Sequence, residues 1–361
     1  MIAVTGGGTG GHIFPVVAVI EELRGRGVLD LCWIGEKGGK EQEWSSSLGV
    51  PYFGIRTGKL RRYFSFQNLT DIFSVLVGIV QAHRILKRAK PAVLFSKGGF
   101  VSVPPALAAR RLNIPVVTHE SDMHPGLATR IIARNASVVC VSFERSAAAF
   151  EGRRVEYTGN PVREALRSAD PSRGARFLDF QDPLPVVTVL GGSLGASSLN
   201  RAVQEMREEG QLSFNLVHQC GRGKVDQGPD RERRFRRFEF IGDEIGDVLA
   251  VSDLIISRAG AGALCEIGFL GKPSILVPLP RSKSRGEQIE NARSFQKRGA
   301  ALVIEDERLS GGTIVSAIED LLHNPERLKS MGSDATALIR TDARKRIADI
   351  LMEISGSEGR S

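Results

Sequence analysis

The sequence is poor in cysteine, with four residues among 361, and no two of them have the spacing of a metal site or a redox motif. We therefore expect all four to be small buried residues of a protein from a reducing compartment. They are Cys32, Cys140, Cys220 and Cys265. The chain also lacks an Asp-x-Asp motif between its predicted strands, and residues 305–307 (Glu-Asp-Glu) are expected to form a solvated turn. We accordingly predict no bound metal and no cofactor.

Long hydrophobic runs are absent as well. The most apolar run, residues 72–80, is interrupted by Ser74 and Gly78, and it is far shorter than the ~20 residues of a membrane span. The amino terminus has neither the charged region nor the cleavage site of a signal peptide. The sequence therefore predicts a protein that neither crosses a bilayer nor carries such a signal.

Excess charge is confined to the first half of the chain. Residues 1–160 contain 20 Lys and Arg against 12 Asp and Glu, whereas residues 161–361 contain 29 of each. A basic half indicates an anionic partner, such as nucleic acid, a lipid head group or a phosphate, although a solvated basic surface has the same composition. With 42% hydrophobic and 25% charged residues, the composition is that of a folded globular protein.

Short runs rich in β-branched residues alternate with helical patterns along the chain. This alternation predicts an α/β fold with parallel sheets that are covered by helices on both faces. The predicted strands are residues 2–5, 31–34, 92–95, 115–118 and 138–141, followed by 186–190, 216–219, 254–257 and 274–277. The first of several predicted helices covers residues 16–23.

The pattern starts again after residues 160–185, which are rich in Pro, Arg and Asp and carry little strand signal. We therefore predict two domains, residues 1–160 and 161–340, with a hinge near residues 159–161. A last helix, residues 342–355, has its apolar residues on one face and is expected to pack back on the first domain.

A glycine loop follows the first strand of each half. Gly6, Gly8 and Gly11 match the dinucleotide pattern G-x-G-x-x-G, and Glu36 follows the second strand. A dehydrogenase that binds NAD through residues 6–36 is therefore one alternative. The second glycine loop, residues 191–195, argues against it, because two such loops suit two phosphate-bearing ligands, each held by backbone N–H groups at a helix start.

The second half has a cluster of small residues at 257–265, followed by Glu266, which we place in the first helical turn. A carboxylate there accepts hydrogen bonds from both hydroxyls of a ribose, or it simply complements the helix dipole. Gln288 and Asn291 share a helix face and are suited to reading sugar hydroxyls. Arg163 is placed to meet a diphosphate, or it is an ordinary surface charge.

Six segments in this order carry a resemblance to a known family. They are Gly-Gly-Thr-Gly-Gly-His at 7–12, Ser-Lys-Gly-Gly-Phe-Val-Ser-Val-Pro at 96–104, His-Glu-Ser-Asp-Met at 119–123, Gly-Asn-Pro-Val-Arg at 159–163, Gly-Gly-Ser at 191–193 and Ser-Arg-Ala-Gly at 257–260. Together they resemble glycosyltransferase family 28 over residues 1 to about 300. The resemblance implies the GT-B fold, with two Rossmann-like parallel-sheet domains facing a deep cleft.

The resemblance also implies an activity, in which N-acetylglucosamine passes from UDP-N-acetylglucosamine to the muramyl C4 hydroxyl of lipid I, with inversion, to form lipid II of peptidoglycan. The implied donor residues are Thr9, Gly10, Gly11, Arg163, Ser193, Ile241, Ala263, Leu264, Glu266 and Gln288. Gly98 and Gly99 are implied to bind the acceptor, whose pyrophosphate would also meet residues 9–11.

The attacking hydroxyl must lose a proton, and His12 on the first glycine loop is our candidate base, with an ordinary pKa near 6.5. A structural hydrogen bond that shapes the loop is the alternative role of His12. Glu120 and Asp122 are rival bases.

Membrane contact is a separate hypothesis. Aromatic and basic residues at 59–66 and basic residues at 83–90 flank the apolar run 72–80, as in a helix that lies on an anionic bilayer. An ordinary buried helix is the alternative. The resemblance favours the membrane, and it places the protein peripherally on the cytoplasmic face of the bacterial inner membrane, with lipid I and cell-wall synthesis proteins as partners and without nucleic acid.

Two alternative functions stay open beside the dehydrogenase. One is a different GT-B nucleotide-sugar transferase that acts on another lipid or on a small molecule. The other is a non-catalytic nucleotide-sugar-binding scaffold, against which the presence of His12, Glu266 and Gln288 argues.

Overall fold

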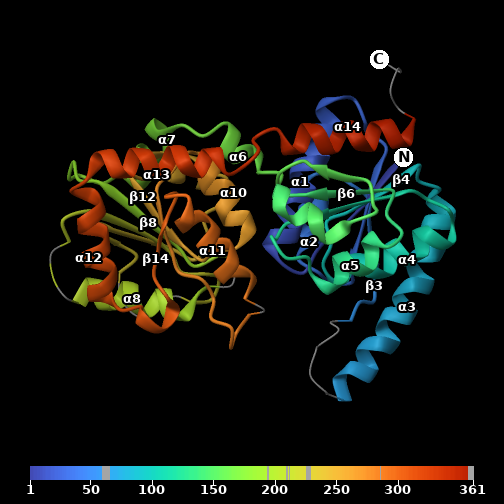
Figure 1. Cartoon of the computed structure of the whole chain (residues 1–361), viewed down its shortest axis with the longest axis horizontal. Coiled ribbons are helices and arrows are strands. Elements are labelled where there is room, and N and C mark those ends of the chain that lie inside the picture. Colours follow the sequence, from blue (N-terminus) through green and yellow to red (C-terminus); the bar gives the residue numbers. More distant parts are fainter. Residues whose placement is uncertain are drawn as a thin grey trace. The chain divides into compact units, whose positions relative to one another are not determined.

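The structure is a computed structural model that describes residues 1–58, 66–192, 195–208, 210, 212–224, 229–284 and 286–356, with the backbone alone for residues 66–70. The chain divides into two compact units (Figure 1). Unit 1 comprises Met1–Arg163 and Thr341–Ser361, and unit 2 comprises Glu164–Arg340. None of the helices in the described ranges is long and apolar enough to pass through a bilayer.

Unit 1 is built on a sheet in which every neighbouring pair of strands is parallel, in the order β3-β2-β1-β4-β5-β6-β7. The strands are β1 (Ile2–Thr5), β2 (Leu31–Glu36), β3 (Tyr52–Ile55), β4 (Val93–Ser96), β5 (Val116–Glu120), β6 (Val138–Val141) and β7 (Val155–Tyr157). The five central strands were predicted to within one or two residues. The two edge strands were missed, because their partly exposed residues do not form a continuous apolar run.

The α-helices of unit 1 are α1 (Gly10–Gly25), α2 (Glu41–Ser47), α3 (Phe66–Ala89), α4 (Val103–Arg111), α5 (Leu127–Ala133) and α14 (Ala343–Ser355), with short 3₁₀ helices at Phe100–Ser102 and Glu144–Phe150. Helix α14 packs on α1, and its Ile347 and Leu351 belong to the same buried cluster as Val16 and Ile20 (Figure 1). The carboxyl-terminal helix is therefore part of unit 1.

Helix α1 begins at Gly10, so the prediction that it begins at residue 16 is wrong. Thr9 has an extended backbone, and its carbonyl oxygen accepts the N–H of Ile13 at 3.1 Å, which starts the helical hydrogen bonding there. Gly10, Gly11 and His12 consequently form the first turn. The N–H of His12 donates to the carbonyl oxygen of Thr9 at 3.0 Å, so the N–H groups of Gly10 and Gly11 are the ones that this helix start offers to an anion.

Unit 2 repeats the plan, with strand order β10-β11-β9-β8-β12-β13-β14 and one antiparallel pair, β10 with β11. The strands are β8 (Val186–Leu190), β9 (Asn215–Gln219), β10 (Arg231–Glu232), β11 (Phe235–Phe238), β12 (Leu254–Ser257), β13 (Ser274–Leu276) and β14 (Leu302–Val303). The α-helices are α6 (Glu164–Arg167), α7 (Pro171–Leu178), α8 (Ser197–Glu208), α9 (Ile245–Val251), α10 (Ala261–Phe269), α11 (Glu287–Lys297), α12 (Gly311–Leu322) and α13 (Pro325–Ala337), with a 3₁₀ helix at Asp306–Arg308.

Each sheet carries its core on strands that are buried on both faces, as parallel sheets require. The four cysteines are buried, as predicted. Burial raises the pKa of the Cys32 thiol to about 11 and that of Cys140 to about 12, with nearby carboxylates adding to the effect. These two thiols stay protonated and serve as core residues. The prediction of an α/β fold with two Rossmann-like parallel sheets is confirmed.

Candidate active site

Each sheet has a topological switch point, where the strand order reverses. It lies between β1 and β4 in unit 1, and between β8 and β12 in unit 2. Open α/β sheets bind ligands at such switch points, outside the carboxyl ends of the strands. In unit 1 the loops at this point are residues 6–9 and 97–99, and in unit 2 they include residues 191–192 and 258–260. The glycine loops found in the sequence therefore lie where each unit is expected to hold a ligand.

The ring of His12 packs against Gly99. A Cβ on Gly99 would lie 3.0 Å from Cδ2 and Nε2 of His12, and the φ of Gly99 is +75°, so the position requires glycine. Nδ1 of His12 is buried and has no hydrogen-bond partner among the described residues. Nε2 is the ring nitrogen that lies beside Gly99.

The electrostatic surroundings of His12 differ from the sequence prediction. Burial and then the positive charge of Lys97 lower the pKa of His12, and a backbone hydrogen bond with Lys97 acts in the opposite direction, so that the pKa falls from 6.5 to about 4. The expectation of an ordinary pKa is therefore wrong. The imidazole is neutral at pH 7, as a general base must be, but it is a weaker base than free histidine.

Lys97 is 1% exposed and lies directly after β4, where its ammonium donates to Oγ of Ser121. Its charge also acts on His119, which is fully buried and has Nε2 2.8 Å from the carbonyl oxygen of Gly159. Burial, then Lys97, then His12 hold the pKa of His119 well below its usual value. Lys97 and His119 belong to the segments that carry the family resemblance, but the sequence predicted no role for either. The signal for Lys97 is its place between a buried strand and two glycines.

The rival bases lie after the next strand, β5. Glu120 is 5% exposed, and its two carboxylate oxygens accept the N–H groups of Asp122 at 3.0 Å and Gly126 at 3.1 Å. These bonds fold the loop that follows β5. Both carboxylate oxygens of Glu120 are thereby engaged within the loop, which disfavours Glu120 as the base. Asp122 is partly buried, and its carbonyl oxygen accepts the hydroxyl of Ser146.

Arg163, at the end of unit 1, does not point away from the fold. Its guanidinium lies over the Phe14 ring of α1 at 4.4 Å from the ring centre. This cation–π interaction holds Arg163, the residue predicted to bind the diphosphate, beside the helix that carries Gly10, Gly11 and His12. The alternative of an ordinary surface charge is therefore disfavoured.

In unit 2, the loop after β12 is tied to two other loops by Arg258. Nη1 of Arg258 lies 2.7 Å from Oδ1 of Asp306 and 3.0 Å from the carbonyl oxygen of Val277, and Nη2 donates to Oγ of Ser198. Ser198 in turn donates to Asp306 at 2.6 Å. Residues 305–307 were predicted to be a solvated turn, which is wrong for Asp306, since its side chain is 9% exposed and ion-paired.

Glu266 lies in the second turn of α10, because the helix begins at Ala261 with Gly260 as its cap; the prediction of the first turn is wrong. Its side chain and that of Ala263 are partly exposed, so both are accessible to a ligand. Leu264 is fully buried, so only its backbone is suited to line a donor pocket.

The remaining donor candidates make hydrogen bonds within the unit. Oε1 of Gln288 accepts the N–H of Leu279 at 3.1 Å, which leaves its amide NH₂ as the group for a sugar hydroxyl. Asn291 is fully buried and donates to the carbonyl oxygen of Ala259 at 3.0 Å, so it supports the loop after β12. The N–H of Ile241 donates to Gln219 at 2.9 Å, so a contact with uracil would use its carbonyl. Ser193 lies outside the described residues.

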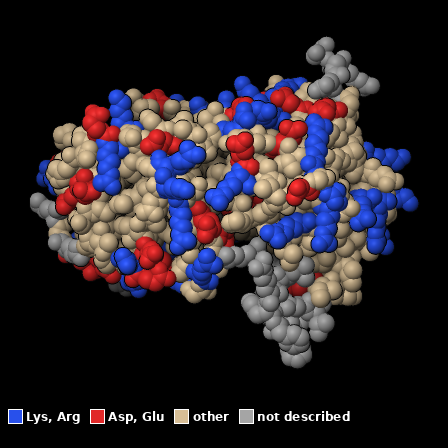
Figure 2. Space-filling view, viewed as in Figure 1, with Lys and Arg blue, Asp and Glu red and all other residues tan. Residues whose placement is uncertain are grey.

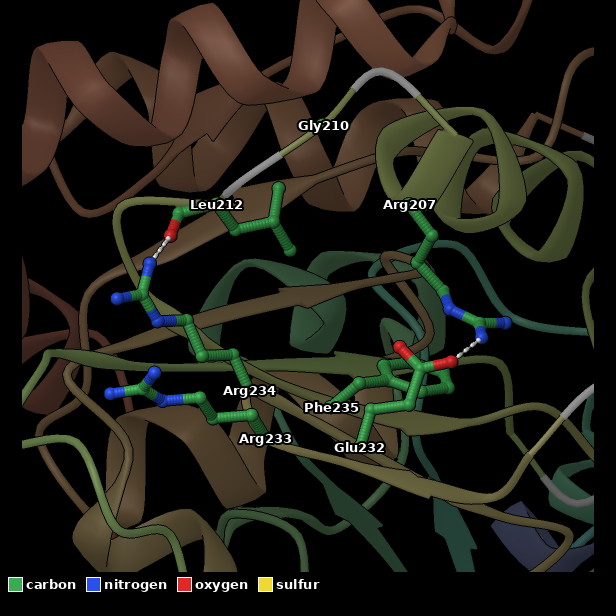
Figure 3. Close-up of a pocket in the computed structure, with 7 residues that line it drawn as sticks. All are labelled: Arg207, Gly210, Leu212, Glu232, Arg233, Arg234 and Phe235. Carbon is green, nitrogen blue, oxygen red and sulfur yellow. Dashed lines mark hydrogen bonds and ion pairs between the residues drawn. The ribbon is translucent and has the colours of Figure 1, made fainter.

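A pocket of about 210 Å³ lies at the opposite end of the sheet in unit 2 (Figure 3). Its residues surround the start of β9 and the β10–β11 hairpin, and they are Arg207, Gly210, Leu212, Glu232, Arg233, Arg234 and Phe235. Arg207 pairs with Glu232 at 2.6 Å, and Arg234 donates to the carbonyl oxygen of Leu212 (Figure 3). The pocket borders the segment before β9 and the turn between β10 and β11, it contains none of the predicted donor residues, and its three arginines are paired with carboxylates.

Within the ranges that the structure describes, no group of three His, Cys, Asp or Glu side chains is arranged to hold a metal ion. The groups present near the switch point of unit 1 are backbone N–H groups and the neutral imidazole of His12, and those near the switch point of unit 2 are backbone N–H groups and the carboxylate of Glu266. Such a set binds phosphates and sugars and accepts one proton.

Comparisons with known proteins give a consistent result. Residues 2–141 match the model of the glycosyltransferase family 28 N-terminal domain, and residues 186–349 match that of the glycosyltransferase family 28 C-terminal domain. The chain is 42% identical over 331 residues to a UDP-N-acetylglucosamine–N-acetylmuramyl-(pentapeptide) pyrophosphoryl-undecaprenol N-acetylglucosamine transferase of Clostridium perfringens, covering 91% of this chain and 92% of that one.

A second such transferase, from Bacillus cereus, is 40% identical over 354 residues, covering 98% of this chain and 99% of its own. Among solved structures, MurG of Acinetobacter baumannii superposes with a TM-score of 0.74 at 26% identity, covering 98% of this chain and 99% of that one. Sequence and fold similarity thus both extend over the two units.

Proposed function

The chain belongs to glycosyltransferase family 28, and from this we propose that it transfers N-acetylglucosamine from UDP-N-acetylglucosamine to the muramyl C4 hydroxyl of lipid I, forming lipid II. The acceptor is the muramyl-pentapeptide pyrophosphoryl-undecaprenol that the relatives' names specify. The observation that carries the proposal is that the segments at residues 7–12, 96–104 and 257–260, together with residues 191–192, lie at the carboxyl ends of the strands that form the switch points of the two sheets.

Unit 2 is the donor unit in this proposal. Glu266 hydrogen-bonds the ribose, Gln288 reads the sugar through its free amide NH₂, and the carbonyl of Ile241 meets the uracil. The diphosphate is held by the backbone at Ala263 and Leu264 near the start of α10 and by Ser193. Arg163, which lies in unit 1, stays a predicted contact of the diphosphate. The partly exposed carboxylate of Glu266 and the engaged Oε1 of Gln288 support these roles.

Unit 1 is the acceptor unit. The lipid pyrophosphate meets the helix start at Thr9, Gly10 and Gly11 and the loop at Gly98 and Gly99, two glycines with positive φ angles. The C4 hydroxyl attacks the anomeric carbon while the bond to UDP breaks, the departing diphosphate takes the electron pair, and His12 takes the hydroxyl proton. One displacement inverts the anomeric configuration from α to β.

The proposal is tested by incubating the protein with UDP-N-acetylglucosamine and a soluble lipid I analogue. We expect the acceptor mass to increase by one N-acetylhexosamine and the new linkage to be β. Parallel incubations with other lipid and small-molecule acceptors test the alternative of a different GT-B transferase. Transfer to one of those acceptors, together with none to the lipid I analogue, would overturn the assignment.

Glu266→Gln is expected to weaken UDP binding by roughly 10- to 100-fold. The reason is that hydrogen bonds to a charged acceptor are worth about 1.5–3 kcal/mol, and an amide keeps only one acceptor atom for two ribose hydroxyls. Isothermal titration with UDP measures the change. Glu307→Gln, at an exposed glutamate of the same unit, is the control and should bind like the wild type. An unchanged affinity in Glu266→Gln would remove the ribose role.

We further propose that α3 lies on the cytoplasmic face of the bacterial membrane. Ile72, Phe73, Leu76 and Val80 are 48–63% exposed and recur along one side of this helix, while Ala82 and Leu86 are buried against the core. The first turns of α3 extend away from the rest of unit 1 (Figure 1). Part of the flanking segment, residues 59–65, lies outside the described residues. The proposal that cell-wall synthesis proteins bind the chain stays a prediction.

Exposed basic side chains lie next to the exposed apolar residues of α3. Exposed residues of α3 and α4, which pack side by side, include Arg84, Lys87, Arg88, Arg110 and Arg111. Blue side chains gather over this edge of unit 1 in Figure 2. An apolar stripe beside a basic cluster is typical of a surface that binds anionic lipid head groups.

Phe73→Glu combined with Leu76→Glu is expected to lower sedimentation with anionic vesicles at least 10-fold, because burial of each apolar side chain contributes about 1.5–3 kcal/mol. Leu29→Glu, at an apolar residue of unit 1 that is 73% exposed, is the control. Turnover of a water-soluble acceptor should be unaffected. Equal binding of the wild type to neutral and anionic vesicles would contradict the electrostatic part.

A further inference from the structure

The carboxylate of Glu41 occupies the glycine cradle between the carboxyl ends of β1 and β2. Glu41 is fully buried at the start of α2. A Cβ on Gly7, Gly35 or Gly39 would lie 2.3, 2.8 or 2.6 Å from its Oε1, so the three glycines leave room for this carboxylate. No cation pairs with it among the described residues.

The carboxylate of Glu41 is held by uncharged hydrogen-bond donors. Oε1 accepts the N–H of Glu36 at 2.7 Å and the hydroxyl of Tyr52 at 3.4 Å, and Oε2 accepts the N–H of Gly8 at 3.3 Å. Burial and then the charge of Glu41 hold the pKa of the Tyr52 phenol well above its usual value. Backbone N–H groups that converge on an anion are what a glycine loop offers to a ligand phosphate.

A dinucleotide-binding unit uses this same place for the ligand, with the glycine loop on the pyrophosphate and an acid after the second strand on the ribose. Here a side chain of the protein fills it. The occupied cradle disfavours the alternative in which residues 6–36 bind NAD.

The loop that Glu41 holds is the loop that leads to His12. Gly8 is fixed on one side by Oε2 of Glu41 and on the other by the Phe100 ring, 2.9 Å from the position of a Cβ. Thr9 follows as the cap of α1, and His12 lies in the first turn against Gly99. The position of the helix start therefore depends on the bond between Glu41 and Gly8.

We infer that Glu41 is a positioning residue for the acceptor site: its carboxylate acts as an internal anion that fixes the first glycine loop, and with it the start of α1 and His12. This inference rests on the proposed function for its substrate. The proposed contacts with uracil and ribose, Ile241 and Glu266, lie in unit 2, so we expect UDP binding to depend on them and not on Glu41.

The test compares Glu41→Gln with Glu43→Gln, since Glu43 is exposed on the same helix. The amide nitrogen of Gln cannot accept an N–H, so one of the bonds to Glu36 and Gly8 is lost while side-chain volume is kept. We expect Glu41→Gln to lower kcat/KM for the lipid I analogue at least 10-fold, with the UDP dissociation constant within twofold of wild type. Glu43→Gln should leave both constants unchanged.

Rescue of Glu41→Ala by added formate is a second measurement, and we do not expect it if Glu41 has only a structural role. Formate carries the deleted carboxylate, so we expect it to restore several-fold of the lost kcat/KM in Glu41→Ala and to leave the wild type and Glu41→Gln unchanged. A Glu41→Gln enzyme with wild-type acceptor kinetics, a parallel loss of UDP affinity, or absence of formate rescue would overturn the inference. A wild-type protein that is inert toward the acceptor would instead overturn the proposed function.

Discussion

His12→Ala is expected to lower kcat by roughly 10²- to 10⁴-fold, the usual contribution of a general base, and to leave the dissociation constant for UDP within twofold. The imidazole lies in the first turn of α1 against Gly99, on the loop that receives the acceptor, whereas the predicted donor contacts are mostly in unit 2. The loss should therefore appear in turnover and not in donor binding. Steady-state kinetics and titration with UDP measure the two effects.

The pH profile of the wild type gives a second readout of the same group. A base works when it is deprotonated, so kcat/KM should fall as pH decreases through the pKa of the free enzyme's base. Because burial and then Lys97 lower the pKa of His12 to about 4, the acidic limb should lie near pH 4 and not near 6.5. His12→Ala should lack this limb.

The control is His124→Ala, which removes an exposed histidine of unit 1. It should retain the kcat and the acidic limb of the wild type. Equal turnover in His12→Ala and His124→Ala would remove His12 from the mechanism and return attention to Asp122, the rival that lies on the loop after β5.

The central strands of both sheets could be predicted because burial on both faces leaves a continuous apolar run. Strand β11 could not, because its sequence Phe-Arg-Arg-Phe places two arginines in a buried strand. Arg236 donates to the carbonyl oxygens of Leu178 and Asp179, and Arg237 pairs with Asp230 at 2.8 Å. The partners of Arg236 lie 58 and 57 positions earlier in the sequence, and no local pattern shows them.

In the candidate site, too, some features can be predicted from local sequence and others depend on residues far apart in the chain. Glycine loops after strands are local signals, and they led directly to His12, Gly99 and the loop after β12. The environment of each side chain is not local. The pKa of His12 depends on its burial and on Lys97, 85 positions along the sequence. Glu41 lies in a segment rich in polar residues, and its carboxylate is buried among three glycines, of which one follows β1, one lies in β2 and one precedes α2.

Arg258→Met is expected to destabilise unit 2 by about 3–5 kcal/mol, because it leaves the carboxylate of Asp306 buried without its cation. Burial by itself would raise the pKa of Asp306, but the hydrogen bonds from Ser198 and Arg258 hold it below its usual value, so the group is charged at neutral pH. Calorimetric unfolding at pH 7 measures the loss. Arg308→Met is the control, since this arginine is 81% exposed and its contact with Glu305 is long, at 3.8 Å.

The double variant Arg258→Met with Asp306→Leu separates stability from donor binding. Replacing both members of a buried ion pair by apolar residues is often neutral, so much of the lost unfolding free energy should return. UDP affinity should stay at least 10-fold below wild type, because Arg258 also anchors the loop after β12 to Val277 and to Ser198 of α8, and leucine and methionine cannot replace those hydrogen bonds. Recovery of stability and UDP affinity together would mean that the network only holds the fold, and that the donor loops need no hydrogen bonds between them.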